Sequence, residues 1–98
     1  MAKGYVIGQI DITDADKYAK YRVEVPKSIA QYGGQYLVRG GNMESIEGEA
    51  PLPRIVVVEF PSFEQAKTWY YSEEYQEVVG IRHAASHGHM FLVEGHDD

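Results

Sequence analysis

The chain has 98 residues, of which 44% are hydrophobic and 24% are charged, and it carries a formal net charge of −6. This length predicts a single domain over residues 1–98. The acidic balance argues against nucleic acid and against anionic membranes as partners, because both attract basic patches. The sequence contains no cysteine, which excludes disulfides, thiol catalysis and thiolate metal sites.

No apolar run approaches the roughly 20 residues that span a bilayer. The N-terminus leads directly into a strand-like pattern, so we expect no signal peptide and a cytoplasmic location. At the other end, residues 95–98 predict a frayed polar tail.

The N-terminal part of the chain predicts one strand followed by helix. Residues 5–12 are rich in β-branched side chains, which favour a strand. Asp14 fits a helix N-cap, and residues 15–32 place apolar side chains at helical spacing.

Two features interrupt this helical segment. Pro26 removes a helical hydrogen bond, so we expect a kink or two short helices divided near Glu24. Gly33-Gly34 predicts the end of the helix, because glycine adopts the left-handed conformation without strain.

The middle of the chain predicts two strands joined by a long connection. Residues 35–40 form the second strand, and residues 54–60, which read RIVVVEF, form the strongest strand in the sequence. Between them, residues 41–53 predict a loop or a loose hairpin extension, with a short strand at residues 43–47 as one alternative.

The C-terminal part predicts helix followed by a last strand. Ser62 fits the N-cap of a second helix, with Gln65 as its capping-box partner. Ser72 begins a further helical stretch, and residues 89–94 form the final strand. The order β-α-β-β-α-β is typical of an α+β, ferredoxin-like fold: a four-stranded antiparallel sheet with helices on one face.

The strands are apolar on both faces, which predicts a homodimer. In the third strand, Val58 and Phe60 point to one side, while Ile55 and Val57 point to the other. Helices on one face leave the second face as an exposed apolar patch, which monomers rarely tolerate. A second copy laid face to face covers it and closes a dimeric α/β barrel. The alternative is that the long loop covers this face.

The sequence resembles small bacterial proteins of a family known as a domain of unknown function, DUF1330, within the dimeric α/β-barrel superfamily. The resemblance covers essentially the whole chain and implies this fold and a homodimer, but no reaction. The wider superfamily includes cofactor-free monooxygenases of aromatic polyketides, lactone isomerases and haem enzymes, so a role drawn from it is analogy. The matching segments are Tyr18-Ala19-Lys20-Tyr21, Tyr32-Gly33-Gly34, Arg39-Gly40-Gly41, Glu47-Gly48, residues 54–60, Trp69-Tyr70-Tyr71-Ser72 with Tyr75, and Arg82.

Three charged residues are the candidate catalytic group. Glu59 interrupts an apolar strand, so its carboxylate needs a partner or a raised pKa. Arg39 and Arg82 are the predicted partners. A carboxylate with a raised pKa beside an arginine could take a proton from an acidic carbon or a phenol. The alternative is a structural ion pair at the end of the strand.

Three aromatic residues are the candidate ligand-binding group. Tyr21, Trp69 and Tyr70 could wall a pocket for a flat apolar ligand. They could equally be core and interface packing, most of all Trp69.

The histidines give no clear metal site. His87 and His89 share a face of the last strand, but two ligands are too few and no carboxylate has obvious spacing to complete the set. We therefore expect no metal and no cofactor. A lone axial haem histidine, His83 or His89, remains an alternative that no spacing supports.

Three functions follow from these residues. The first is a small-molecule enzyme without a tightly bound cofactor, monooxygenase- or isomerase-like, acting on an aromatic or carboxylated metabolite. The second is a ligand-binding or regulatory homodimer without catalysis. The third is a purely structural homodimer.

Overall fold

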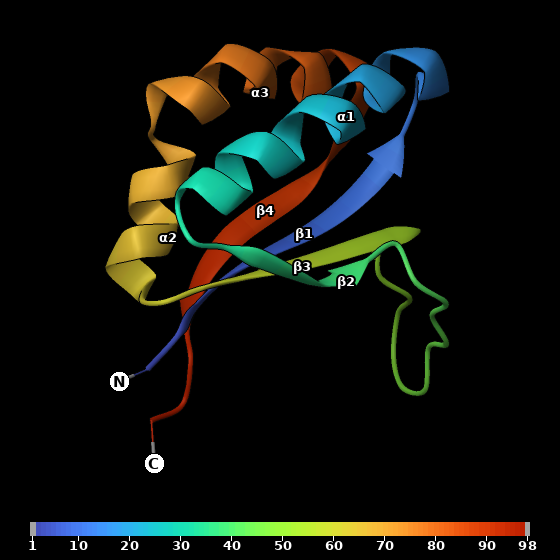
Figure 1. The fold of residues 1–98 in the computed structure, drawn as a ribbon. Coiled ribbons are helices and arrows are strands. Elements are labelled where there is room, and N and C mark those ends of the chain that lie inside the picture. Colours follow the sequence, from blue (N-terminus) through green and yellow to red (C-terminus); the bar gives the residue numbers. More distant parts are fainter. Residues whose placement is uncertain (1, 98) are drawn as a thin grey trace.

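Four antiparallel strands form an open sheet in the order β2-β3-β1-β4 (Figure 1). This arrangement comes from a computed structural model, which describes residues 2–97. The alternating burial along the first strand shows that one face of the sheet packs inward. The strands are β1 (Gly4–Ile12), β2 (Gln35–Arg39), β3 (Arg54–Phe60) and β4 (Ser86–Glu94).

Three helices lie on one face of this sheet, which confirms the predicted ferredoxin-like fold (Figure 1). Their N-caps are the side-chain oxygens of Asp14, Ser62 and Ser72, each of which accepts a backbone N–H from three residues further on. The three predicted starts are therefore correct. The helices are α1 (Ala15–Gln31), α2 (Phe63–Tyr70) and α3 (Glu73–Ala85).

The expected division of the first helix into two is wrong, because α1 continues through Pro26. Proline has no N–H, so the carbonyl of Arg22, four residues earlier, loses its helical donor. Arg39 Nη2 donates to this carbonyl at 2.8 Å. A side chain from β2 thus replaces the hydrogen bond that Pro26 removes. The helix ends where the sequence predicts, with Tyr32 as its C-cap and Gly33, at a φ of 81°, directly after it.

Three local predictions need correction. Residues 43–47 form no strand, and residues 41–53 run as an irregular connection. Strand β4 begins at Ser86 rather than at His89, because it pairs with β1 along its whole length. Gln65 closes no capping box; its side chain donates to the carbonyl of Tyr32 at 3.0 Å.

The predicted tail begins with an ordered residue. The N–H of Gly95 donates to the carbonyl of Lys3 at 2.7 Å. Asp98 lies outside the described residues. Within residues 2–97, no helix is long and apolar enough to cross a membrane.

The core lies between the inner face of the sheet and the helices. Val6 and Phe60 from the sheet are almost completely buried, as are Trp69 and Tyr75 from the helices. The indole N–H of Trp69 donates to Ser28 Oγ at 3.0 Å, so the largest core side chain also has its polar atom satisfied.

The opposite face of the sheet has no helix on it (Figure 1). Ile7 pairs with Val57 on one side and with Phe91 on the other, so an apolar row crosses three strands. The side chain of Phe91 is 44% exposed and that of Val93 is 39% exposed. We call this the open face; its apolar character confirms that the strands are apolar on both sides.

Candidate functional site

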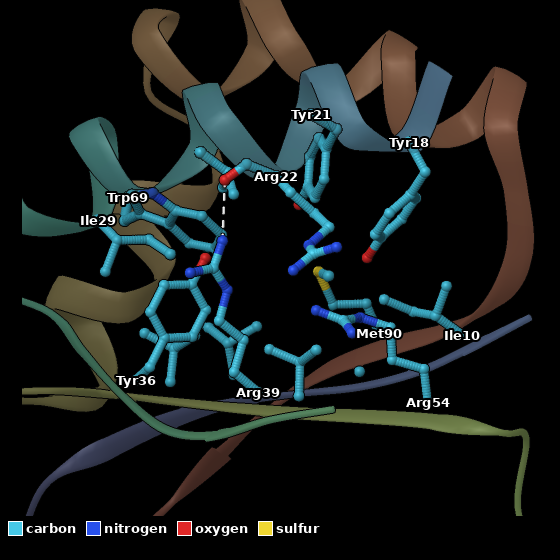
Figure 2. A pocket seen from close by; sticks show the side chains of 15 residues that line it. Ile10, Tyr18, Tyr21, Arg22, Ile29, Tyr36, Arg39, Arg54, Trp69 and Met90 are labelled. Atoms are coloured by element: carbon cyan, nitrogen blue, oxygen red, sulfur yellow. Dashed lines mark hydrogen bonds between the residues drawn. The ribbon is translucent and has the colours of Figure 1, made fainter. Parts of the chain in front are cut away.

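A small cavity lies between α1 and the inner face of the sheet (Figure 2). Its volume is about 30 Å³, which holds about one or two water molecules. Side chains from the sheet and from the helices meet there. The lining residues are Val6, Gly8, Ile10, Tyr18, Tyr21, Arg22, Val25, Ile29, Tyr36, Arg39, Arg54, Val56, Val58, Trp69 and Met90.

The cavity exists partly because β1 presents a glycine at its centre. Gly8 lies on the inner face between Val6 and Ile10, where a side chain would otherwise fill the space. A Cβ built on Gly8 would meet Ile10 Cδ1 at 3.5 Å and Met90 Cε at 3.6 Å, which is ordinary van der Waals contact. The position is therefore open rather than sterically reserved for glycine.

An irregularity in β2 directs two of its side chains into the cavity. Tyr36 and Arg39 are three residues apart, so a regular strand would place them on opposite faces. The register against β3 shifts between Tyr36 and Val38, as in a β-bulge. Both Tyr36 and Arg39 therefore line the cavity, and the Arg39 guanidinium lies over the Tyr36 ring at 4.5 Å.

Three arginines converge on this cavity from three different elements. Figure 2 shows the guanidinium groups of Arg22 on α1 and Arg54 on β3 directed into the space, while that of Arg39 on β2 lies at its side and donates to the backbone carbonyl of Arg22. The described lining residues include no carboxylate. Arg54 Nε is buried and has no hydrogen-bond partner. The cavity thus has mainly aromatic and aliphatic walls and three positive charges, with no carboxylate among its lining residues to balance them.

A chain of hydroxyl groups leads from the cavity into the core. Tyr21, which lines the cavity, lies with its Oη 2.8 Å from Tyr75 Oη. Arg82 Nε donates to Tyr75 Oη at 3.3 Å, and Arg82 Nη2 lies 3.3 Å from His83 Nε2. Arg82 is only 7% exposed, so its guanidinium is buried behind Tyr75 rather than placed in the cavity.

Burial determines the ionisation of these phenols. It raises the pKa of Tyr21 well above its ordinary value, and the neighbouring Tyr75 raises it further. Burial also raises the pKa of Tyr75, although Arg82 acts in the opposite direction. Both phenols are therefore protonated near neutral pH.

The predicted pairing of Glu59 with Arg39 or Arg82 is wrong. Glu59 lies on the open face, where its carboxylate accepts from Tyr5 Oη at 3.2 Å and from Gln35 Nε2 at 3.0 Å. Arg39 is on the opposite face because of the shift in β2. The alternation of β3 correctly grouped Glu59 with Ile55 and Val57, but it could not reveal where the arginines point.

The three predicted aromatic residues have different positions. Tyr21 and Trp69 line the cavity, and Trp69 is also part of the core. Tyr70 does not line it; its ring packs on Trp69, Tyr71 and Tyr75. The structure thus brings two of the three together with Arg39.

The histidines of β4 and α3 lie away from the cavity. His87 Nε2 is 3.4 Å from Asp11 Oδ2, a neighbour created by the pairing of β4 with β1. Among residues 2–97, no group of three possible ligands is arranged to hold a metal ion.

Sequence reasoning missed four polar residues of the cavity. Tyr18 and Arg22 are on the same helix as Tyr21, and Tyr36 and Arg54 lie at or near strand ends. The only signal for Tyr18 and Arg22 was helical spacing, because Tyr18 lies three residues before Tyr21 and four before Arg22 along α1. Nothing in the sequence indicated the side to which Arg54 points.

Solved structures share this fold. A protein of unknown function from Rhodopseudomonas palustris superposes with a TM-score of 0.78 at 16% identity, covering 99% of this chain and 85% of that one. The methylated form of that protein gives 0.78 at 15% identity, covering 98% and 82%. A conserved protein from Methanosarcina mazei Go1 gives 0.57 at 12% identity, covering 100% and 95%. At these identities the likeness shows the fold alone.

The family follows from the sequence model rather than from these superpositions. Among curated proteins, none matches the chain significantly. The model of the domain of unknown function DUF1330 matches residues 3–96, which is nearly the whole chain. The protein therefore belongs to the DUF1330 family.

Proposed function

We propose that the protein binds a small aromatic carboxylate in the cavity between α1 and the sheet. The observation that carries this proposal is the meeting of Arg22, Arg39 and Arg54 around one space whose described walls hold no acid. Guanidinium groups bind carboxylates through paired, charge-assisted hydrogen bonds. The anion would supply the negative charge that the walls lack.

The remaining walls suit a flat ring. Trp69, Tyr18 and Tyr36 contribute aromatic surface, while Val56 and Met90 contribute aliphatic surface. Such a mixture of apolar walls and a few convergent polar groups is typical of ligand pockets.

The present volume is smaller than any such ligand, so binding requires side chains to move. Arg22 and Arg39 are both exposed residues. Arg39 is held by one hydrogen bond to the carbonyl of Arg22 and by its contact with Tyr36. An outward rotation of these two long side chains opens the space that they now occupy.

Calorimetric titration with benzoate and with benzamide tests the proposal, because the two differ in charge but hardly in shape. We expect benzoate to bind and benzamide to bind at least tenfold more weakly. Arg39→Gln and Arg54→Gln should each weaken benzoate binding by about tenfold, the effect of losing one charge-assisted hydrogen bond.

Lys67→Gln is the matched control, because this exposed lysine on α2 changes the net charge equally but lies outside the cavity. It should leave benzoate affinity within about twofold of the wild type. Equal affinities for benzoate and benzamide, or equal losses in all three variants, would show that the arginines form no anion site.

Catalysis without a cofactor is the second candidate, and the hydroxyl chain from Tyr21 to Arg82 favours it. Protonated phenols beside a group of cations can stabilise negative charge that develops on a substrate oxygen. Glu59 is not available to this cavity as a base, since it lies on the open face. An enzyme built on this site would therefore act through stabilisation of an enolate or phenolate.

We also propose that the working unit is a homodimer joined through the open face. The row of Ile7, Val57 and Phe91 is apolar and has no helix over it. The long connection gives little cover: residues 41–50 are exposed, and the contact of the connection with this face is at its edge, where Leu52 N–H donates to Gln9 Oε1 at 3.3 Å. Glu59, with Tyr5 and Gln35, would then lie inside the barrel between the two copies.

A further inference from the structure

Arg54 carries a buried hydrogen-bond donor that the protein leaves unpaired. Its Nε is buried, and among residues 2–97 no acceptor lies within hydrogen-bond distance. A guanidinium has donors only, so this N–H has no other role to take. A buried donor without a partner costs free energy, and in a native protein such a group needs an explanation. Because the guanidinium is directed into the cavity (Figure 2), a ligand there can supply the acceptor.

Gly40 determines which edge of this guanidinium is free. The residue directly follows β2, and its N–H donates to the carbonyl of Ile55 at 2.8 Å, which holds it beside Arg54. A Cβ built on Gly40 would collide with Arg54 Nη1, so the glycine leaves the room in which this end of the guanidinium lies. Arg54 Cζ also lies over the Tyr18 ring, 5.6 Å from its centroid. With Nη1 against Gly40, the edge formed by Nε and Nη2 remains for a ligand.

We infer that Arg54 anchors the carboxylate of the ligand through Nε and Nη2, and that Gly40 positions it for this contact. The inference rests on the proposed function and gives its three arginines different parts. Arg39 Nη2 already donates to the carbonyl of Arg22, and Arg22 is exposed, whereas Arg54 keeps a buried donor without an acceptor. Two parallel N–H groups match the two oxygens of one carboxylate, so this edge favours planar carboxylates over ligands with a single oxyanion, such as phenolates.

The Nε–H of Arg54 can be followed directly by proton–nitrogen correlation NMR. Its signal is assigned by its absence from the spectrum of Arg54→Lys. Benzoate should move this proton downfield, because the N–H enters a charge-assisted hydrogen bond, and benzamide at the same concentration should shift it far less. Bound benzoate with an unmoved Nε–H signal overturns this inference and leaves the arginine site of the proposed function intact.

Arg54→Lys separates the paired donors from the charge, because lysine keeps the positive charge and lacks the planar edge. We expect benzoate binding to weaken about tenfold in Arg54→Lys, as in Arg54→Gln. Calorimetric titration measures both variants. Wild-type affinity in Arg54→Lys would show that the charge alone is sufficient, and it would overturn the role of the Nε–Nη2 edge.

Gly40→Ala tests the positioning role, because the new methyl group takes the place of Arg54 Nη1 and displaces the guanidinium. Gly48→Ala is the matched control. The two glycines have φ values of 70° and 72°, so both variants bear similar backbone strain, but a Cβ on Gly48 meets nothing within 4 Å. Gly40→Ala should weaken benzoate binding several-fold, and Gly48→Ala should leave it unchanged. Equal benzoate affinities in the two variants would overturn the role of Gly40.

The possible results separate this inference from the proposed function. A wild-type protein that does not bind benzoate overturns both together. If Gly40→Ala or Arg54→Lys does not fold, the Nε–H signal of the wild type decides, with its assignment taken from Arg54→Gln. A downfield shift of that signal with benzoate then supports the inference, and an unmoved signal overturns it.

Discussion

At the scale of single residues, the candidate site depends on Gly8, which has no side chain to fill the cavity. Gly8 lies at the centre of the inner face of β1, flanked by the buried Val6 and Ile10. A larger residue there would occupy the space that the three arginines line. The contact distances show that a methyl group fits without displacing the backbone.

Gly8→Ala should therefore stabilise the fold while weakening the site. We expect the free energy of unfolding to rise by about 0.5–1 kcal/mol, because alanine restricts the unfolded chain more than glycine does. Benzoate affinity should fall several-fold, since the new methyl group enters the cavity. Urea unfolding and calorimetric titration measure the two effects.

Gly80→Ala is the control, because Gly80 is exposed on α3 and a Cβ there meets nothing within 4 Å. It should stabilise the fold by a similar amount and leave benzoate affinity unchanged. A loss of stability in Gly8→Ala would contradict the view that this position is open.

The candidate residues could be predicted from the sequence only in part. Tyr21 and Trp69 could be predicted as pocket walls from their aromatic character, whereas Arg39 was predicted for the wrong reason, as a partner of Glu59, which instead contacts Tyr5 and Gln35. Arg22, in the middle of α1, and Arg54, at the start of β3, could not be found, since an arginine in either place is usually a solvated side chain. Which side chains meet depends on how α1 crosses the sheet, and no periodicity contains that information.

At the scale of elements, α1 and β2 are joined by an exchange of hydrogen bonds. Pro26 frees the carbonyl of Arg22, and Arg39 binds it at 2.8 Å. The same arginine packs on Tyr36. The proline thus creates an acceptor that holds one of the cavity arginines across the gap between helix and sheet.

Pro26→Ala should increase the free energy of unfolding by about 1–2 kcal/mol. A proline inside a helix costs about 3 kcal/mol relative to alanine, and the Arg39 hydrogen bond and the restricted unfolded chain offset part of this. Chemical denaturation measures the change. Pro53→Ala, in the exposed connection before β3, is the control and should not gain stability.

An unchanged or lower stability of Pro26→Ala would mean that Arg39 already compensates fully for the missing helical bond. That result would also explain why the expected division of the helix does not occur. The order of elements, the three N-caps and the glycine stop were all predictable, because each depends on local chemistry. The continuity of α1 was not, since its compensating donor lies 13 residues further along the chain than Pro26.

At the scale of the whole molecule, the open face is an apolar surface that a single copy of the chain leaves exposed to solvent. Val38, which pairs with Val57, is 39% exposed, in addition to the half-exposed Phe91 and Val93. A sheet covered by helices on one side normally has polar residues on the other. This imbalance is why the strand pattern alone was sufficient to suggest a partner.

Phe91→Lys should convert the protein from a dimer to a monomer in sedimentation velocity at micromolar concentration. A charge in this apolar row would be buried without a partner in the dimer, at a cost of several kcal/mol. In the monomer the lysine reaches solvent, so the fold should persist by circular dichroism.

Val23→Lys is the control, because Val23 is equally apolar and 65% exposed, but it lies on α1, away from the open face. It should leave the oligomeric state unchanged. A wild-type protein that sediments as a monomer at this concentration would end the dimer proposal.

The register shift between Tyr36 and Val38 has a consequence for the family as a whole. One extra residue in the edge strand β2 determines whether the side chain of Arg39 lies on the inner face of the sheet or on the open face. A homologue with a shortened β2 would send the counterpart of Arg39 outward. The cavity of such a homologue would be lined by two arginines instead of three and would bind an anionic ligand more weakly. Insertions and deletions at this point of β2 are therefore changes by which ligand specificity could vary within the family.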